Sequence, residues 1–161
     1  MRQVSHLLDI EHRHALDLLG RVEHACARAS RLGAARDPEF TKLAAAFSGL
    51  IEEDTGRHFD FEERELFSRM MQSGEGDIAG LLKDEHDAIR AVAAEVLPLA
   101  RAAAAQTLDD AGMEQFRRGV LEMVERQVAH IQKETMALLP MLDDLLDDAT
   151  DSELCLAYAS S

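Results

Sequence analysis

Two copies of one short histidine and glutamate pattern constrain the fold of this chain more than any other feature. In the first copy His12 precedes His58-Phe59-Asp60-Phe61-Glu62, and in the second His86 precedes His130-Ile131-Gln132-Lys133-Glu134. The lone histidine leads its motif by similar intervals, 46 residues (12 to 58) and 44 residues (86 to 130). Because residues four apart share one face of an α-helix, each His-x-x-x-Glu can direct both side chains at one point. The repeat therefore predicts two helical hairpins whose histidines and glutamates converge.

Apolar residues recur at helical intervals in four segments, separated by loop signals at Gly33–Arg36 and Gln72–Gly76. We expect helices over residues 4–32, 38–71, 77–105 and 107–139. This pattern predicts an all-α fold, an up-down-up-down four-helix bundle in which each helix contributes at least one histidine or glutamate. A short acidic C-terminal tail or helix should fold back on the bundle through Leu154, Leu156 and Tyr158.

The expected helix ends rest on capping residues and prolines. Asp37 should cap the second helix, with Pro38 in its first turn, and Asp77 should cap the third. Residues 107–110 resemble a capping box for the fourth helix. Prolines should kink or interrupt the third and fourth helices, at Pro98 and Pro140 respectively.

Length and composition limit the remaining possibilities. The 161 residues are most simply a single domain over 1–161, with a core at about 5–141. A net charge of −14 argues against nucleic acid and against anionic membrane surfaces as partners. We find no stretch of 18 apolar residues and no apolar signal core, so we expect a cytoplasmic protein. Cys26 and Cys155 lie far apart and suggest reduced, part-buried side chains.

The convergent side chains predict a site for two transition-metal ions. Neutral imidazole suits iron, zinc, copper and nickel, and a carboxylate can bridge two metals, as Glu62 and Glu134 could. Six side chains for two ions leave positions open for dioxygen, nitric oxide, peroxide or water, whereas a closed zinc site favours four ligands and cysteine. The candidate metal ligands are His12, His58, Glu62, His86, His130 and Glu134.

A ferritin-type di-iron bundle is the main structural alternative. It needs Glu-x-x-His on two helices and a glutamate on two more. Glu11 and His14 supply one such motif, but His58, His86 and His130 have no glutamate three residues earlier. The ferritin pattern therefore fails on three of the four helices.

The motifs resemble those of the hemerythrin-like HHE cation-binding family over about residues 5–141. The matching pieces are Glu11-His12-Arg13, His58 to Glu63 with Leu66-Phe67, Glu85-His86, and His130 to Glu134 with Leu138-Leu139-Pro140. The resemblance implies the six ligands given above and a non-haem di-iron centre with an oxo or hydroxo bridge, although zinc or manganese could take its place. A small diatomic ligand, oxygen or nitric oxide, and a redox partner protein are also implied.

The chain departs from the oxygen-carrying hemerythrins at two places. Those proteins carry His-x-x-x-His on the third helix, where this chain has Arg90 four residues after His86. They also have an aspartate five residues after the histidine of the fourth helix, where this chain has Glu134 four after His130. The resemblance is thus closer to bacterial HHE and di-iron repair proteins. The latter also carry an N-terminal cysteine-bearing domain that this chain lacks, which argues against iron–sulfur cluster repair.

Other polar residues near the motifs are expected to serve structure or solubility. Histidines 6, 14 and 24 should face solvent. Three glutamates next to the candidate ligands could hydrogen-bond to ligand side chains and orient them, namely Glu11, Glu63 and Glu85. The favoured interpretation is that these three side chains are solvated. Arg90 should form an exposed salt bridge. Leucine or isoleucine one turn after the ligands should form core and wall an apolar pocket, at Leu16, Leu66, Ile89 and Leu138.

Three functions are compatible with this reading. The first is a non-catalytic protein that binds, senses or stores oxygen or nitric oxide at a di-iron centre. The second is an enzyme that turns over peroxide or nitric oxide at the same irons. The third is a helical interaction or metal-buffering module that holds zinc or has lost its metal. The sequence favours the first.

Overall fold

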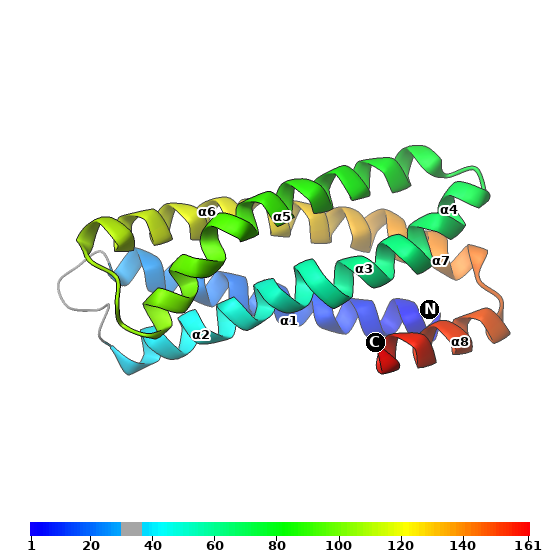
Figure 1. Ribbon diagram of the computed structural model, residues 1–161. Coiled ribbons are helices and arrows are strands. Elements are labelled where there is room, and N and C mark those ends of the chain that lie inside the picture. The colour runs from blue at the N-terminus through cyan, green and yellow to red at the C-terminus, as the bar shows by residue number, and fades with distance from the viewer. Residues whose placement is uncertain (30–36) are drawn as a thin grey trace.

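The protein is described here by a computed structural model covering residues 1–29 and 37–161. The expected loop at 33–36 and the end of the expected first helix lie outside these residues. Within the described residues the helical segments join end to end into four long rods, and one shorter helix is separate. Figure 1 shows their arrangement. The first rod is α1 (Gln3–Ala29) and the third is α5 (Gly76–Ala104). The second rod consists of α2 (Pro38–Glu53), η2 (Asp54–His58), α3 (Phe59–Phe61), η3 (Glu62–Phe67) and α4 (Ser68–Gln72). The fourth rod consists of α6 (Asp110–Lys133), η4 (Glu134–Leu138) and α7 (Leu139–Leu145), and the shorter helix is α8 (Asp148–Ser160).

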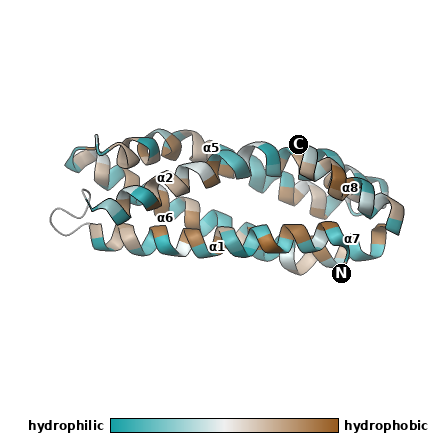
Figure 2. Ribbon diagram, turned by 90° about the horizontal axis from the view of Figure 1, so that it is seen from below, coloured by the Kyte–Doolittle hydropathy of each residue, from teal (hydrophilic) through white to brown (hydrophobic). Residues whose placement is uncertain are grey.

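The four long rods form an antiparallel bundle, which confirms the predicted fold class. Helix α1 packs against α2 and α6, and α5 packs against the same two helices, so each rod has two neighbours. Along the helices apolar and polar residues alternate, as the brown and teal segments of Figure 2 show. None of the described helices is long and apolar enough to cross a membrane.

Three short π-helical segments interrupt the second and fourth rods at the His-x-x-x-Glu motifs. His58 ends η2, Glu62 begins η3 and Glu134 begins η4. In η4 the N–H of Leu139 bonds to the carbonyl of Glu134, five residues back instead of four. Such wide turns in α-helices are frequent at functional sites, and here all three lie at the two His-x-x-x-Glu motifs.

Two predicted caps were wrong and one was right. Asp37 accepts a hydrogen bond from the N–H of Glu39 and caps α2, as expected. Helix α5 begins at Gly76, so Asp77 lies inside its first turn. Asp109, not Thr107, caps α6 by accepting from the N–H of Gly112 at 2.6 Å. Thr107 instead donates its hydroxyl to the last turn of α5, at the carbonyl of Ala102.

The bend predicted for the third helix is present, and neither proline ends its rod. Helix α5 continues through Pro98 to Ala104 and bends in its last part (Figure 1). Pro140 lies in the first turn of α7, directly after the π segment η4, and the rod continues to Leu145. A helix tolerates proline in its first turn, because the N–H that proline lacks is not needed there.

The buried interior consists of two apolar clusters with a polar layer between them. On α1 His12 lies between Leu8 of one cluster and Leu19 of the other. On α5 His86 lies in the same way between Leu82 and Ile89. Apolar packing on both sides therefore holds these two histidines at one level of the bundle and keeps that level dry.

Helix α8 folds back along the N-terminal part of α1, as the sequence predicted for the C-terminal segment. Leu154 and Tyr158 are buried, whereas Leu156 is 70% exposed. The side chain of Asp151 accepts hydrogen bonds from the N–H groups of Gln3 and Val4, at 2.8 and 2.9 Å. These are free donors of the first turn of α1, so Asp151 caps that helix from the other end of the chain.

Candidate metal centre

The six predicted ligand residues meet at the polar layer of the bundle. Each of the four rods supplies at least one of them. All six side chains are buried, with Glu62 and His86 fully inaccessible and none of the six more than 4% exposed. The residues that come together are His12, His58, Glu62, His86, His130 and Glu134.

The inward-facing atoms form two groups of four that share the two carboxylates. In one group Nε2 of His58 lies 3.0 Å from Oε1 of Glu62, and Nε2 of His12 lies 3.0 Å from Oε2 of Glu134. In the other group the distances are 3.2 Å from His86 Nε2 to Glu62 Oε2 and 2.9 Å from His130 Nε2 to Glu134 Oε1. Each glutamate thus offers one oxygen to each pair of imidazoles.

Four of these buried atoms make no well-aligned hydrogen bond, although each faces an imidazole or a carboxylate of the cluster at 2.9–3.2 Å. They are Nε2 of His12, both carboxylate oxygens of Glu62 and Oε1 of Glu134. A buried unpaired polar atom costs about 1–3 kcal/mol, and more when it is charged. A cation between the carboxylates and the imidazoles would satisfy all four. The residues present therefore fit a metal ion at each group.

The charges of the cluster attract one another strongly. Burial disfavours ionisation of Glu134, but His130, His12 and His86 bring its pKa well below the usual value. Burial likewise opposes protonation of His86, yet hydrogen bonds with Glu134 and Glu62 raise its pKa to about 9. The metal-free cluster therefore holds anionic carboxylates beside proton-retaining imidazoles, and a bound cation would replace those protons.

The outward-facing Nδ1 atoms of the histidines have their own partners. Nδ1 of His58 lies 2.9 Å from Glu11, that of His86 lies 3.0 Å from Glu63, and that of His130 lies 2.8 Å from Glu85. Each carboxylate accepts the Nδ1–H, which leaves the Nε2 lone pair directed inward for a metal. The favoured prediction that these three glutamates are solvated was wrong.

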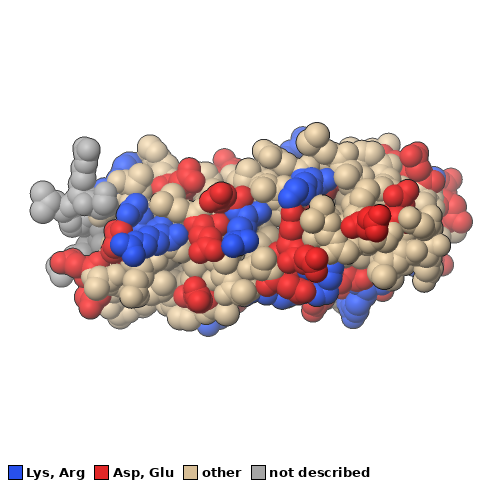
Figure 3. Space-filling view, turned by 90° about the horizontal axis from the view of Figure 1, so that it is seen from above, with Lys and Arg blue, Asp and Glu red and all other residues tan. Residues whose placement is uncertain are grey.

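Basic side chains hold these three glutamates from outside. Arg90 donates from Nη1 to Glu63 at 2.6 Å, so the predicted salt bridge is confirmed, but the pair is part-buried and not exposed. Lys133 pairs with Glu85, and Arg57 lies 3.5 Å from Glu11. Basic and acidic side chains also lie next to one another on the face of the molecule seen in Figure 3. The pKa of each glutamate is lowered, because these hydrogen bonds and charges outweigh the effect of burial.

One sequence signal could have indicated two of these partners. Glu11 and Glu85 each directly precede a histidine, and the Glu-His pair recurs in both copies of the pattern. Neither glutamate contacts the histidine that follows it in the sequence. Glu11 contacts His58, and Glu85 contacts His130. Glu63 is adjacent to Glu62 and gave no such signal.

The remaining expectations near the site were mostly confirmed. Histidines 6, 14 and 24 are exposed. Among the expected core residues Leu66, Ile89 and Leu138 are buried, but Leu16 is only partly buried. Phe59 stacks on His86 with ring centroids 3.7 Å apart and an interplanar angle of 5°. Cys26 is buried and Cys155 partly buried, both as free thiols.

A small cavity of about 10 Å³ adjoins the cluster. Ala15, Phe59 and Ile131 contribute apolar walls, and none of the four predicted wall residues lines it. Asp54 and Gln127 add polar groups, and the amide Nε2 of Gln127 donates to Asp54 at 3.2 Å. The space beside the cluster is therefore partly polar and has room for only a very small molecule.

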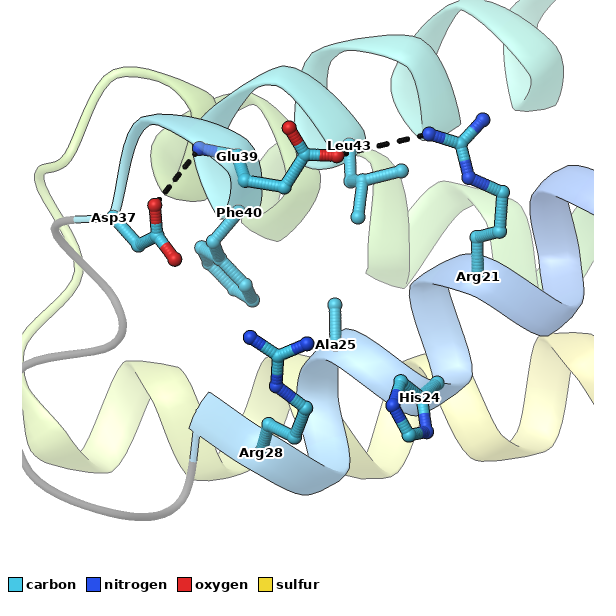
Figure 4. A pocket seen from close by; sticks show the side chains of 8 residues that line it. All are labelled: Arg21, His24, Ala25, Arg28, Asp37, Glu39, Phe40 and Leu43. Carbon is cyan, nitrogen blue, oxygen red and sulfur yellow. Dashed lines mark hydrogen bonds and ion pairs between the residues drawn. The ribbon is translucent and has the colours of Figure 1, made fainter.

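A larger pocket, of about 180 Å³, lies between the end of α1 and the start of α2 (Figure 4). Arg21 and Glu39 face each other across it at 3.7 Å, and Asp37 is engaged in capping α2. This pocket holds none of the clustered histidines and glutamates, so the cluster between the two apolar layers is the candidate site.

A helical bundle that buries such a cluster of histidines and glutamates defines a cation-binding protein of the four-helix type. The chain belongs to the hemerythrin HHE cation-binding domain family, whose family model matches residues 3–142. No curated protein matches the sequence. The family match ends before α8, so this helix and its contacts are features of the chain beyond the family domain.

Proposed function

We propose that this protein holds two iron ions between His12, His58, His86, His130 and the two glutamates, and that it binds or senses oxygen or nitric oxide there. One observation carries the proposal, namely the two buried groups of four ligand atoms that share Glu62 and Glu134 and in which four polar atoms lack a well-aligned hydrogen bond. Membership of a cation-binding family supports the same conclusion.

Each residue of the cluster has a distinct role in this proposal. Glu62 and Glu134 would hold both ions together, and the histidines would hold one ion per pair. Bound iron would supply Lewis acidity and one-electron redox chemistry. Glu11, Glu63 and Glu85 keep the imidazole protons on Nδ1, and the apolar clusters exclude bulk water. A set of six side chains leaves room for a small ligand, and the cavity beside Asp54 and Gln127 provides a place for it.

Metal analysis with an optical spectrum tests the iron centre directly. Protein purified from an iron-replete host should contain about two irons per chain and show near-ultraviolet bands, which should change on addition of nitric oxide or oxygen. Glu134→Gln should reduce the iron content to less than one per chain. Glu125→Gln, an exposed position on α6, is the matched control and should retain two irons. Zinc, or less than one metal in the unaltered protein, would contradict the proposal.

Turnover separates a binding protein from an enzyme at the same centre. If the protein only binds its ligand, the iron-loaded form should decompose peroxide no faster than free iron. Faster turnover that is lost in Glu62→Ala and His130→Ala would instead establish an enzyme. The two free cysteines fit a reducing compartment such as the cytoplasm, where a redox partner would return the irons to the ferrous state.

A further inference from the structure

Helix α8 brings one side chain into the surroundings of the candidate centre. The hydroxyl of Tyr158 lies 3.1 Å from Nδ1 of His58 and donates to Oε2 of Glu11, the same oxygen that accepts from His58. Tyr158 is only 3% exposed, and its ring lies 4.6 Å from that of Phe61. His58, Glu11 and Tyr158 thus each contact the other two. Of the three, Tyr158 lies outside residues 3–142, which the family model matches.

Further contacts fix Tyr158 in this place. The guanidinium of Arg57 lies 4.4 Å from the centre of the tyrosine ring and donates from Nη1 to the Tyr158 carbonyl at 3.0 Å. Asp151, two turns earlier on α8, caps α1. The position of the tyrosine hydroxyl therefore depends on the docking of the whole helix and not on one contact.

The two halves of the candidate centre differ in how their imidazoles are held. By the internal repeat, Glu11 and Glu85 are equivalent, and so are the residues that follow the bridging glutamates, Glu63 and Thr135. Glu63 accepts from His86 at 3.0 Å, but Thr135 reaches Nδ1 of His12 only at 3.5 Å and carries no charge. A carboxylate behind an imidazole makes it a better metal ligand.

The difference extends to the second imidazole of each half. His130 has Glu85, which Lys133 alone shares. His58 has Glu11, whose carboxylate is 37% exposed and also contacts Arg57. The Tyr158 hydroxyl donates to Oε2 of Glu11, the oxygen that faces His58, whereas Arg57 contacts Oε1. Thus the His86/His130 half has two carboxylate-backed imidazoles, and the His12/His58 half has one, whose orientation depends on α8.

We propose that the two metal positions are unequal, that the His12/His58 position is the weaker, and that Tyr158 is the positioning residue that sets its affinity. This inference rests on the proposed metal centre. It gives α8 a role in metal loading, since the second ion would be retained only while the helix is docked.

Titration of the metal-free protein with zinc ion alone tests the proposal, because zinc is diamagnetic and permits NMR of the imidazole nitrogens. The unaltered protein should bind two zinc ions in separate steps. The ring signals of His86 and His130 should change in the first step, and those of His12 and His58 in the second. Tyr158→Phe removes only the hydroxyl and should weaken the second step by about tenfold, with the first unchanged. The Nδ1 signal of His58 should shift at the same time.

Two further variants separate positioning from a loss of structure. Leu156→Ala, on the exposed face of α8, should leave both steps unchanged. Thr135→Glu gives His12 the carboxylate that His86 already has and should tighten the second step, a gain that misfolding cannot produce. Exposure of residue 135 leaves space for the larger side chain.

The outcomes distinguish this inference from the proposed function. If no zinc binds to the unaltered protein, the metal centre itself fails. If two zinc ions bind but Tyr158→Phe weakens both steps equally, tightens the second, or changes neither, the role of Tyr158 is overturned. Amide exchange at Gln3 and Val4 reports whether α8 is still docked. A weakened second step accompanied by faster exchange at both amides would mean that Tyr158 acts only through helix docking, which overturns its role as the positioning residue.

Discussion

Asp54 is a titratable residue beside the cluster and does not belong to the repeated His and His-x-x-x-Glu pattern. It begins η2, lines the small cavity and accepts a hydrogen bond from Gln127. Burial raises the pKa of its carboxyl from 3.8 to about 6, although His58 and His12 partly oppose this effect. At neutral pH the metal-free protein thus carries a costly buried charge at this position.

The sign of the resulting pH dependence can be predicted. Because the folded pKa exceeds the unfolded one, the folded state binds more protons between pH 3.8 and about 6, and the free energy of unfolding falls as pH rises through this window. Asp54→Asn removes this loss. Its stability relative to the unaltered protein should rise by about 2 kcal/mol from pH 4 to pH 7.

Denaturant unfolding of chelator-treated protein at several pH values measures this difference. Asp84→Asn, at an exposed position on α5, serves as the control and should follow the unaltered protein. A constant difference between Asp54→Asn and the unaltered protein from pH 4 to pH 7 would contradict the assigned cause.

At the scale of residues, the sequence predicted the convergence of the cluster but not its surroundings. His58 and Glu62 lie four residues apart, so their shared helix face is a local property that a sequence displays. The contacts from Glu11 to His58 and from Tyr158 to both join different helices. Such contacts depend on how the rods are rotated and on where α8 docks, which no local pattern contains.

Helix packing depends on close approach at one glycine. A methyl group added to Gly119 of α6 would lie 2.6 Å from Cγ2 of Val96 on α5. Gly20, in the middle of α1, has nothing within 4 Å of the same position. A substitution at Gly119 therefore tests the space between α5 and α6, whereas one at Gly20 tests only the higher helix propensity of alanine.

Alanine substitutions at these glycines should have opposite effects. Gly119→Ala should lower the free energy of unfolding by about 1–2 kcal/mol, since overpacking exceeds the gain in helix propensity. Gly20→Ala should raise it by about 0.5–1 kcal/mol. Urea unfolding of both variants checks the pair, and stabilisation by Gly119→Ala would show that α5 and α6 can separate at little cost.

At the scale of elements, apolar periodicity predicted the four rods, but not the π segments or two of the caps. Periodicity reports which face is buried, and a single π turn shifts that face by only one residue. The sequence Thr107-Leu108-Asp109-Asp110 offers several side chains that can cap a helix. Gln106 has a positive φ of 58°, and this turn determines that Asp109, not Thr107, meets the free N–H groups of α6.

At the scale of the whole molecule, metal and fold should be coupled, because the cluster draws on all four rods. Any ion bound there stabilises only the folded state. With free metal at 100 times its dissociation constant, one site contributes about 2.7 kcal/mol. Chelation should therefore lower the midpoint of thermal unfolding, and restoring the metal should recover it.

Thermal unfolding with and without chelator measures this coupling. In Glu134→Gln the midpoint should no longer respond to metal, because one shared ligand is lost from both positions. In Glu125→Gln the response should equal that of the unaltered protein. A midpoint that responds to metal equally in all three proteins would mean that the ion binds elsewhere.

The outer carboxylates connect the buried cluster with the dissolved salt around the protein. Glu63, Glu85 and Glu11 each contact a buried imidazole on one side and a partly exposed arginine or lysine on the other. Salt ions screen the outer contacts far more than the inner ones. As ionic strength rises, each carboxylate is released from its basic partner and acts more fully on its imidazole. The metal affinity of a site that water does not reach would thus change with the salinity of the medium.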